Sequence, residues 1–294
     1  MNARGDGGEP PVGLGHEALP VGNGKLGAMV HGGVERDVVQ LNLQGLWAGR
    51  EHAQDGAKFR EALPKVRELL FAGQYDEANA LASKTLVGEW DESWYGKYQT
   101  LGDLIIETNH ANASNYTREL SLDLGIARVN YEADDAKWER VVFASQPDRA
   151  IVVRVAGTKP LSMKLAIQRD ECTIRGGEQG IYWFGKAPDG GAEWRASCQV
   201  HARKGSVSVN GHWLVVEGAD EVVLVVRADV ITRFMREDGS FPSWDQPVNF
   251  QQLVYRHSEA HRRQFARVSL DLGGWEKAAQ PTDERVYAVR RGGE

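Results

Sequence analysis

The sequence has few cysteines, no long apolar run and no excess of positive charge. Its 294 residues include two cysteines, Cys172 and Cys198, which are too few for a disulfide framework and too far apart for a metal knuckle or a redox motif. The longest apolar run, Val222–Val226, has the length of a strand, whereas a helix that spans a bilayer needs about 20 apolar residues. The formal net charge is -6, so no basic field is available to hold nucleic acid. We therefore expect two free thiols, and neither a membrane nor a nucleic acid as a partner.

The N-terminal residues lack the apolar core of a secretory signal peptide and are rich in glycine and proline. We expect residues 1–16 to form a flexible N-terminus. As written, the sequence predicts a cytoplasmic protein, whereas a true start upstream of Met1 would allow a secreted or periplasmic one.

Short strand-like segments dominate the sequence from about Tyr98 to Val230. Turn signals such as Pro147-Asp148 separate them, and apolar and polar residues alternate in Ala196–Ala202, as in a sheet with one solvated face. Many short antiparallel strands with hairpin-length connections favour a mainly β fold, a large antiparallel super-β-sandwich, over a parallel α/β fold. We place this sandwich domain at residues 17–245.

Two segments have helical periodicity. Phe59–Leu86 repeats apolar residues at helical spacing and is interrupted by Gly73, which predicts a helical hairpin inserted between strands. Val248–Ala266 is polar with one apolar face, and it predicts a C-terminal linker helix followed by a short strand at Val268–Leu272. We assign residues 246–294 to a helical linker and the truncated start of a further domain.

Two motifs resemble cofactor or metal sites. Gly22–Gly27 satisfies G-x-G-x-x-G, but a strand-like run follows it where a dinucleotide-binding fold needs a helix. We interpret it as a glycine turn whose main-chain amides, around Asn23 and Gly24, can approach a ligand closely. His257 and His261 lie one helical turn apart, yet no third ligand is near in the sequence, so we expect both to pack against the sandwich. No cofactor and no metal are expected.

Aromatic residues and carboxylates are interleaved in the segment from Gly88 to Tyr98. Sugars stack their C–H faces on aromatic rings while polar groups bind their hydroxyls, which makes Trp90, Trp94 and Tyr98 candidate sugar contacts. The alternative is a loop fixed to the core by its aromatic side chains, and the two interpretations have equal weight. Carboxylates such as Asp148 fall at strand ends and turns, where we expect them to be solvated.

The stretch Glu17–Val30, with Gly32–Arg36, resembles the opening of family 95 glycoside hydrolases, the α-L-fucosidase-like enzymes, which read A-L-P-I-G-N-G-R-L-G-A-M-V-F-G-G-V-E-R and then L-N-E-D-T-L-W. The agreement keeps its order along the chain, at Leu41-Asn42, Leu46-Trp47, Leu63-Pro64, Tyr98-Gln99, Leu101–Leu104, Arg118–Leu120, Val142–Ser145, Arg267–Gly273 and Pro281–Arg285.

The resemblance implies an N-terminal super-β-sandwich, a helical linker and an (α/α)6 barrel that carries the chemistry. Similar enzymes hydrolyse α-L-fucosidic or related L-galactosidic linkages, typically with inversion, so the implied partners are a fucosylated glycan or oligosaccharide and the barrel of the parent chain. The acid and base of the family belong to the barrel, so no catalytic residue is assigned here, and we expect the chain alone to be inactive. The candidates for substrate or interdomain contact are Asn23, Gly24, Asn42, Trp47, Trp90, Trp94 and Tyr98.

The sequence departs from the family where N-E-D-T-L-W is replaced by Asn42-Leu43-Gln44-Gly45-Leu46-Trp47. The loss of two acidic positions and a threonine hydroxyl puts the contacts of this edge in doubt. Two alternatives therefore stay open: a non-catalytic carbohydrate-binding β-sandwich, and a docking module for a separately encoded barrel. In each case we expect an exposed apolar patch where a barrel would pack.

Overall fold

The structure is a computed structural model, and it describes residues 2–4, 18–49, 57–86, 96–177, 180–231, 248–274, 276 and 280–292. The chain forms two compact units. The first contains Met1–Leu46, Gln99–Lys186 and Glu193–Glu294, and the second contains Trp47–Tyr98 and Ala187–Ala192.

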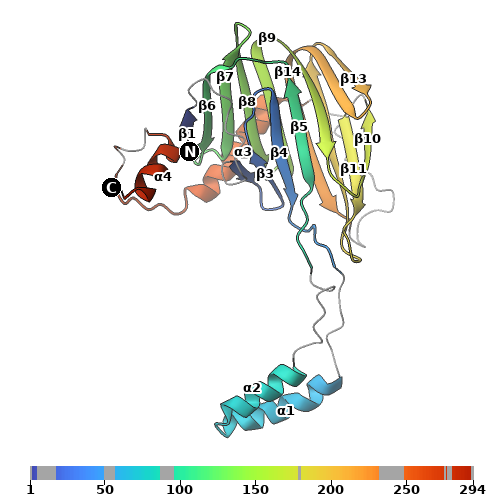
Figure 1. Ribbon diagram of the computed structural model, residues 1–294, viewed down its shortest axis with the longest axis vertical. Helices are drawn as coiled ribbons and strands as arrows, with labels where there is room; N and C mark the ends of the chain where they lie inside the picture. Colours follow the sequence, from blue (N-terminus) through green and yellow to red (C-terminus); the bar gives the residue numbers. More distant parts are fainter. Residues whose placement is uncertain are drawn as a thin grey trace. The chain divides into compact units, whose positions relative to one another are not determined.

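Antiparallel strands build the first unit (Figure 1). Nine of them pair in the order β1-β6-β7-β8-β9-β14-β12-β11-β10 and form the first layer. Their bounds are β1 Asn2–Arg4, β6 Ser114–Ser121, β7 Ile126–Ala133, β8 Ala136–Ser145, β9 Ala150–Gln168, β14 Trp213–Val230, β12 Glu193–Arg203, β11 Gly180–Lys186 and β10 Thr173–Gly177.

The second layer shares two long strands with the first. It contains β2 Leu19–Gly22, β3 Leu26–Val30, β4 Arg36–Leu43 and β5 Gly102–Thr108, and β5 pairs with the C-terminal half of β9. The N-terminal half of β14 pairs with that half of β9 and with β13 Ser206–Asn210. Two register shifts, between Val216 and Glu221, interrupt β14 where it passes from one layer to the other. Bulges bend strands in this way, and the expected antiparallel β-sandwich is confirmed.

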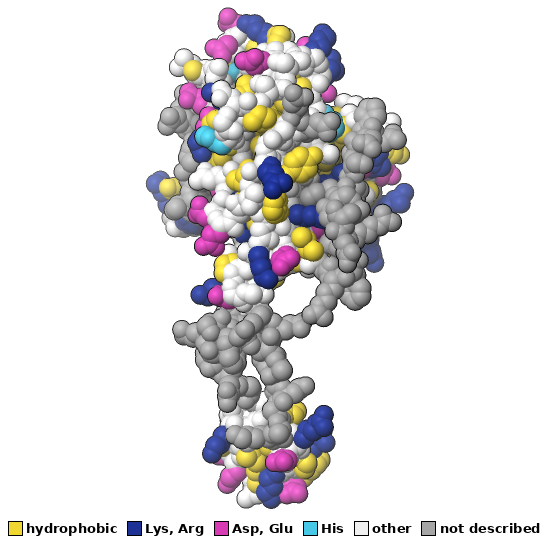
Figure 2. Space-filling view, turned by 90° about the vertical axis from the view of Figure 1, so that its right-hand side faces the viewer, with side chains coloured by type: hydrophobic (Ala, Val, Ile, Leu, Met, Phe, Trp, Pro, Cys, Tyr) yellow, Lys and Arg dark blue, Asp and Glu magenta, His cyan; other side chains and the backbone are white. Residues whose placement is uncertain are grey.

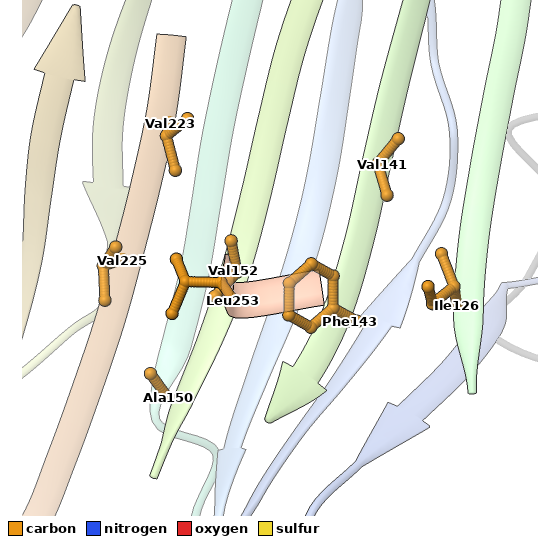
Figure 3. Packing of buried hydrophobic residues seen from close by; sticks show 8 residues of the cluster. All are labelled: Ile126, Val141, Phe143, Ala150, Val152, Val223, Val225 and Leu253. Carbon is orange, nitrogen blue, oxygen red and sulfur yellow. The ribbon is translucent and has the colours of Figure 1, made fainter. Parts of the chain in front are cut away.

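The strand Val222–Val226 is apolar at every position because both of its faces are covered. Val222, Leu224 and Val226 are fully buried, and their neighbours Val223 and Val225 point to the opposite face. On that face Val223 and Val225 belong to a cluster with Phe143, Val152 and Leu253 (Figure 3).

Helix α3, Phe250–Phe265, covers this outer face of the first layer (Figures 1 and 3). The side chain of Asn249 accepts a hydrogen bond from the amide of Gln252 and caps the helix. Leu253 is 1% exposed, and burial of such a side chain stabilises the fold by about 1.5–3 kcal/mol. His257 and His261 donate to the carbonyl oxygens of Gly125 and Leu122. The expectation that both histidines pack against the sandwich is confirmed.

The second unit holds the helical hairpin predicted from the sequence. Helix α1 covers Ala57–Phe71 and α2 covers Tyr75–Thr85. Gly73 has a φ of +76° between them, a conformation that glycine adopts without a steric penalty. Val66 and Ala78 are the buried residues among the described side chains of the hairpin. No described helix is long and apolar enough to cross a membrane.

The C-terminal part of the first unit differs from the prediction at Val268–Leu272. This segment forms no strand, and Val268, Leu270 and Leu272 are 78–86% exposed. Its alternating pattern specifies an apolar face, but an isolated strand needs a neighbour to satisfy its backbone. Helix α4, Thr282–Arg290, follows and has no buried residue. The proposed domain boundaries stay a prediction.

Candidate functional site

The turn between β2 and β3 is organised by Asn23. Its Oδ1 accepts hydrogen bonds from the amides of Lys25 (3.0 Å) and Leu26 (2.8 Å), and its Nδ2 donates to the carbonyl oxygen of Ser145 (3.0 Å). Gly24 has a φ of +87°, and a Cβ added to it would meet no heavy atom within 4 Å. The motif is thus a tight turn entering strand β3, and its tip is open to a ligand.

A hollow of about 340 Å³ lies beside this turn, and we call it the turn hollow. Two turns line it: the β2–β3 turn supplies Asn23 and Lys25, and the β8–β9 turn supplies Gln146, Pro147 and Arg149. The hydrogen bond from Asn23 to Ser145 ties one turn to the other. The geometry of the hollow therefore depends on a residue that the sequence had marked as a candidate.

Charged side chains surround the turn hollow in pairs. Lys25 Nζ lies 2.7 Å from Asp229 Oδ1, and Arg149 Nη2 lies 4.0 Å from Asp229 Oδ2. Asp148 accepts from Ser145 Oγ (2.5 Å) and from Arg256 Nη2 of α3 (2.6 Å), and its side chain is 6% exposed. The expectation of a solvated Asp148 was wrong, because the turn folds back under α3.

Buried charge near Asp148 adds to this network. Burial lowers the pKa of Arg227 to about 10, although the carboxylate of Asp148 opposes the shift. Lys25 and Arg149 keep part of their surface in solvent, at 32% and 71% exposure. The cationic side chains of Lys25 and Arg149, an amide side chain and the main chain of the turn are groups that can form hydrogen bonds with hydroxyl groups. Both carboxylates, Asp148 and Asp229, are engaged with cations.

A separate aromatic site lies in the second unit. Trp47 and Tyr98 form an isolated antiparallel bridge, and their ring centroids are 5.4 Å apart at an angle of 70°. The rings are exposed, at 49% for Trp47 and 41% for Tyr98. The carbonyl of Trp47 accepts from the amide of Ala192, and a Cβ on Gly191 would clash with that carbonyl oxygen. The backbone around Trp47 is therefore closely packed, while the rings of Trp47 and Tyr98 remain exposed. Aromatic rings of this kind stack on sugars.

Comparison with known proteins identifies the domain. Residues 9–234 match the profile of the family described as "Glycosyl hydrolase family 65, N-terminal domain". The chain belongs to this family. It is therefore a glycoside hydrolase N-terminal domain.

The relatives of this family 65-type domain carry fucosidase names. It is 28% identical to "Alpha-L-fucosidase 2" of Arabidopsis thaliana over 93% of this chain and 38% of that protein. It is 31% identical to "Probable alpha-fucosidase A" of Aspergillus niger over 49% of this chain and 18% of that protein. A protein of the same name from Aspergillus oryzae is 28% identical over 53% of this chain and 22% of its own length. The chain spans less than half the length of each of these relatives.

The structure does not gather all predicted residues of the domain into one site. Asn42 alternates with the buried Leu41 and Leu43, so its side chain lies on the outer face of the second layer, opposite Gly27. The amide of Asn23 instead points to Ser145 in the first layer. Trp90 and Trp94 lie outside the described residues.

The structure gives a reason for the glycine at position 45, where the family 95 pattern has threonine. A Cβ at this position would lie 2.9 Å from the side chain of Val230, tighter than ordinary van der Waals contact. The neighbouring Gln44 donates its amide to the carbonyl of Lys25, which joins this segment to the glycine turn.

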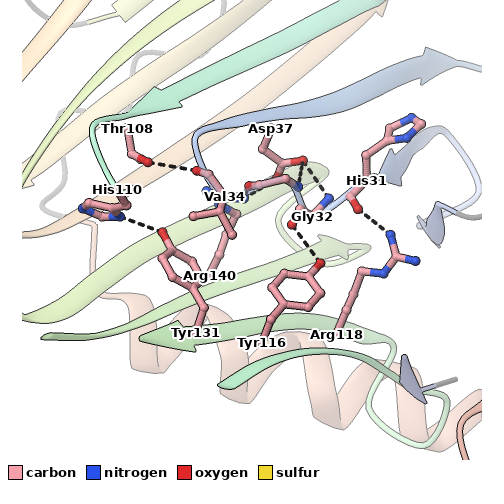
Figure 4. Close-up of polar contacts among 11 residues, drawn as sticks. His31, Gly32, Val34, Asp37, Thr108, His110, Tyr116, Arg118, Tyr131 and Arg140 are labelled. Carbon is pink, nitrogen blue, oxygen red and sulfur yellow. Dashed lines mark hydrogen bonds and ion pairs between the residues drawn. The ribbon is translucent and has the colours of Figure 1, made fainter. Parts of the chain in front are cut away.

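A buried ion pair that the sequence reasoning missed joins the two layers (Figure 4). Asp37 and Arg140 are fully buried, and Arg140 Nη1 lies 2.5 Å from Asp37 Oδ2. The other oxygen of Asp37 accepts from the amides of Gly32 (2.7 Å) and Gly33 (3.1 Å).

Tyr116 and Arg118 of β6 extend the network by donating to the carbonyls of Gly32 and His31 (Figure 4). Burial raises the pKa of Tyr116 to about 12. A sequence signal existed for the ion pair: Asp37 and Arg140 fall at inward positions of strands that are otherwise apolar on that side.

Proposed function

We propose that this chain is the N-terminal sandwich of a family 95-type glycoside hydrolase that cleaves α-L-fucosidic or related L-galactosidic linkages with inversion. The observation that carries the proposal is the ordered agreement with fucosidase sequences along the chain, together with a relative named α-L-fucosidase that matches 93% of it. In this proposal the general acid and the general base belong to an (α/α)6 barrel that lies outside this sequence.

Inversion requires a general acid and a general base about 6.5–9.5 Å apart, with room for a water between the base and the sugar. Near the turn hollow, Asp148 and Asp229 are both paired with cations. A role in holding substrate or the barrel, with no role in proton transfer, fits that pairing. The contact residues in this proposal are Asn23, Gly24, Asn42, Trp47 and Tyr98, with Trp90 and Trp94 as further candidates from the sequence.

An assay on an aryl α-L-fucoside tests the proposal. The purified chain should show no turnover above buffer. A chimera that joins it to the remaining C-terminal part of the Arabidopsis relative should hydrolyse the fucoside, and NMR of the first-formed sugar should show the inverted anomer. Turnover by the isolated chain, with contaminants excluded by a Gly33→Trp misfolding control, would overturn the assignment of chemistry to the barrel. An active chimera that releases the retained anomer would overturn inversion.

A second function, a free-standing carbohydrate-binding module, is favoured by one observation. Trp47 and Tyr98 expose two rings in T-shaped contact. Titration calorimetry of the chain with 2′-fucosyllactose distinguishes the two functions. Saturable heat that is lost in Trp47→Ala and kept in Phe71→Ala, which changes an exposed ring on α1, would favour the module.

A further inference from the structure

A second hollow lies on the outer face of the first layer, away from the residues that the sequence marked. It has a volume of about 350 Å³. We call it the sheet hollow, and the charged and amide residues of its lining are Asn115, Asn130, Glu132, Lys137, Glu139 and Arg154. We propose that the sheet hollow binds a neutral oligosaccharide. This site is independent of the turn hollow and of the fucosidase assignment.

A β-bulge shapes one wall of the sheet hollow. Asn115 has a φ of 51°, and the register of β6 against β7 shifts between Ser114 and Thr117. Bulges re-aim side chains, and strained backbone of this kind persists where the surrounding structure enforces it. Here the bulge directs the amide of Asn115 to Glu132, where Nδ2 lies 2.9 Å from Oε2. The amide and the carboxylate are thereby fixed side by side on the wall.

The floor of the sheet hollow is a clamped arginine. Arg154 Nε lies 2.5 Å from Glu221 Oε2, and its Nη1 lies 2.7 Å from Glu139 Oε2. Its guanidinium also lies 4.9 Å from the centre of the Phe250 ring of α3. The side chain is 19% exposed. Two carboxylates and a ring therefore hold the floor rigid before any ligand arrives, which lowers the entropic cost of binding.

The charges of the sheet hollow select against an anion. Glu132 and Glu139 balance Lys137 and Arg154 among the lining residues, and the nearby Glu221 adds a further negative charge. A phosphate or sulfate site would instead need unneutralised cations. The described residues also contain no group of three or more acidic, histidine or cysteine side chains arranged to hold a metal.

Planar amides, carboxylates and a guanidinium match the chemistry of sugar hydroxyls, which both donate and accept hydrogen bonds. The apolar part of the lining suits the C–H face of a pyranose. The residues that supply it are Ala156, Gly157, Tyr131 and Trp138. Gly157 lies beside the Trp138 ring, which a Cβ at this position would overlap. Trp138 is fixed by its donation to Ala133 and by its stacking on His110 at 3.9 Å.

Titration calorimetry of the full chain with cellohexaose and with 2′-fucosyllactose tests the proposal. At least one of the two probes should bind saturably. Asn130→Ala and Asn115→Gly should each weaken that binding at least tenfold. Asn115→Gly removes the amide but keeps a residue that tolerates the positive φ, so it should fold normally, and a matched thermal unfolding curve checks this. Phe71→Ala, which changes an exposed ring on α1 and touches neither hollow, should leave the affinity within twofold.

Three results would overturn the inference. The first is the absence of heat with both oligosaccharides, and the second is unchanged affinity in both asparagine variants. The third is binding of inorganic phosphate that displaces the sugar. A loss in Gln146→Ala, which alters the turn hollow, with both asparagine variants unchanged would likewise overturn the inference and assign the binding to the turn hollow. The fucosidase assay of the chimera reports separately, because the sheet hollow variants leave the turn hollow intact.

Discussion

Asp37 and Arg140 have no exposed surface, yet both carry charge between two apolar layers. Removing water from two ions costs several kcal/mol per ion, and here the ion pair and the amides of Gly32 and Gly33 offset that cost. The alternation of β4 and β8 places both positions on the inward side, but neither residue was marked in the sequence analysis. The partner lies 103 positions away along the chain, and such a pairing follows from the register of two layers.

Asp37→Ala should destabilise the fold by about 3–5 kcal/mol, because Arg140 would be left buried without a counter-charge. Urea denaturation followed by tryptophan fluorescence measures this loss. Glu107→Ala is the control, since its pairing with Arg36 is exposed and exposed ion pairs contribute about 0–1 kcal/mol. Equal losses in the two variants would show that the buried pair is not a principal tie between the layers.

Two glycines should respond differently to alanine. Gly24→Ala should cost about 1–2 kcal/mol, because the left-handed backbone is strained for alanine while the space around it is open. Gly157→Ala should cost more, about 2–4 kcal/mol, because its Cβ would overlap the ring of Trp138 and force the core apart. Thermal unfolding of both variants gives the order, and a larger loss for Gly24→Ala would contradict the packing argument.

Helix α3 shows what local sequence can and cannot specify about an element. Its apolar face predicted a helix and the docking of His257, because the 3.6-residue period is local information. Gly73 marked the break between α1 and α2 for the same reason. The pattern at Val268–Leu272 predicted a strand with equal clarity, but a strand depends on a neighbour that the described residues do not provide. The placement of Asn42 and Asn23 on different faces likewise depends on how strands pair.

The docking of α3 should weaken in acid. Burial lowers the pKa of His257 below its ordinary value of 6.5, and His261 lowers it further, while the carbonyls of Gly125 and Leu124 and the carboxylate of Asp148 oppose the shift. A lowered pKa in the folded state means that the neutral ring is favoured. Its contribution to stability is therefore complete above the unfolded pKa and is lost as the pH falls through the folded pKa.

Unfolding free energies measured between pH 7.5 and pH 5 should fall with pH in the native chain, and less steeply in His257→Gln. Burial also lowers the pKa values of His110 and His201, so some slope should remain in the variant. Gln251→Ala, which changes an exposed, uncharged residue on the same helix, serves as the control and should keep the native slope. Identical slopes for His257→Gln and the native chain would exclude His257 as a titrating contact.

At the scale of the whole molecule, charge is mixed, and one group of exposed apolar residues lies in the C-terminal part of the first unit. Lysine, arginine and acidic side chains are interspersed over the face shown in Figure 2, in keeping with the small net charge of -6. By contrast, Val268, Leu270 and Leu272 are strongly exposed, as are Tyr287 and Val289 of α4. Exposed apolar groups of this kind are typical of interaction surfaces. They fit the proposal that a barrel domain packs on this part of the parent protein.

The isolated chain should therefore self-associate, and Leu270→Asp combined with Leu272→Asp should shift it toward the monomer. Sedimentation velocity over a concentration series measures the change. Leu70→Asp on α1, which alters a 45% exposed leucine elsewhere, is the control and should leave the distribution unchanged. A native chain that sediments as a monodisperse monomer at every concentration would contradict the prediction.

The class of fold could be predicted from the sequence, since strand length, alternation and turn residues are properties of short segments. The use of β9 and β14 by both layers could not, because nothing local marks a strand that changes sheets. Because these two strands belong to both layers, the layers cannot separate without breaking hydrogen bonds within a sheet. A layer can open only by breaking the ladders that hold the other, so the first unit should respond to stress as a single mechanical body, with β9 and β14 as its last elements to yield.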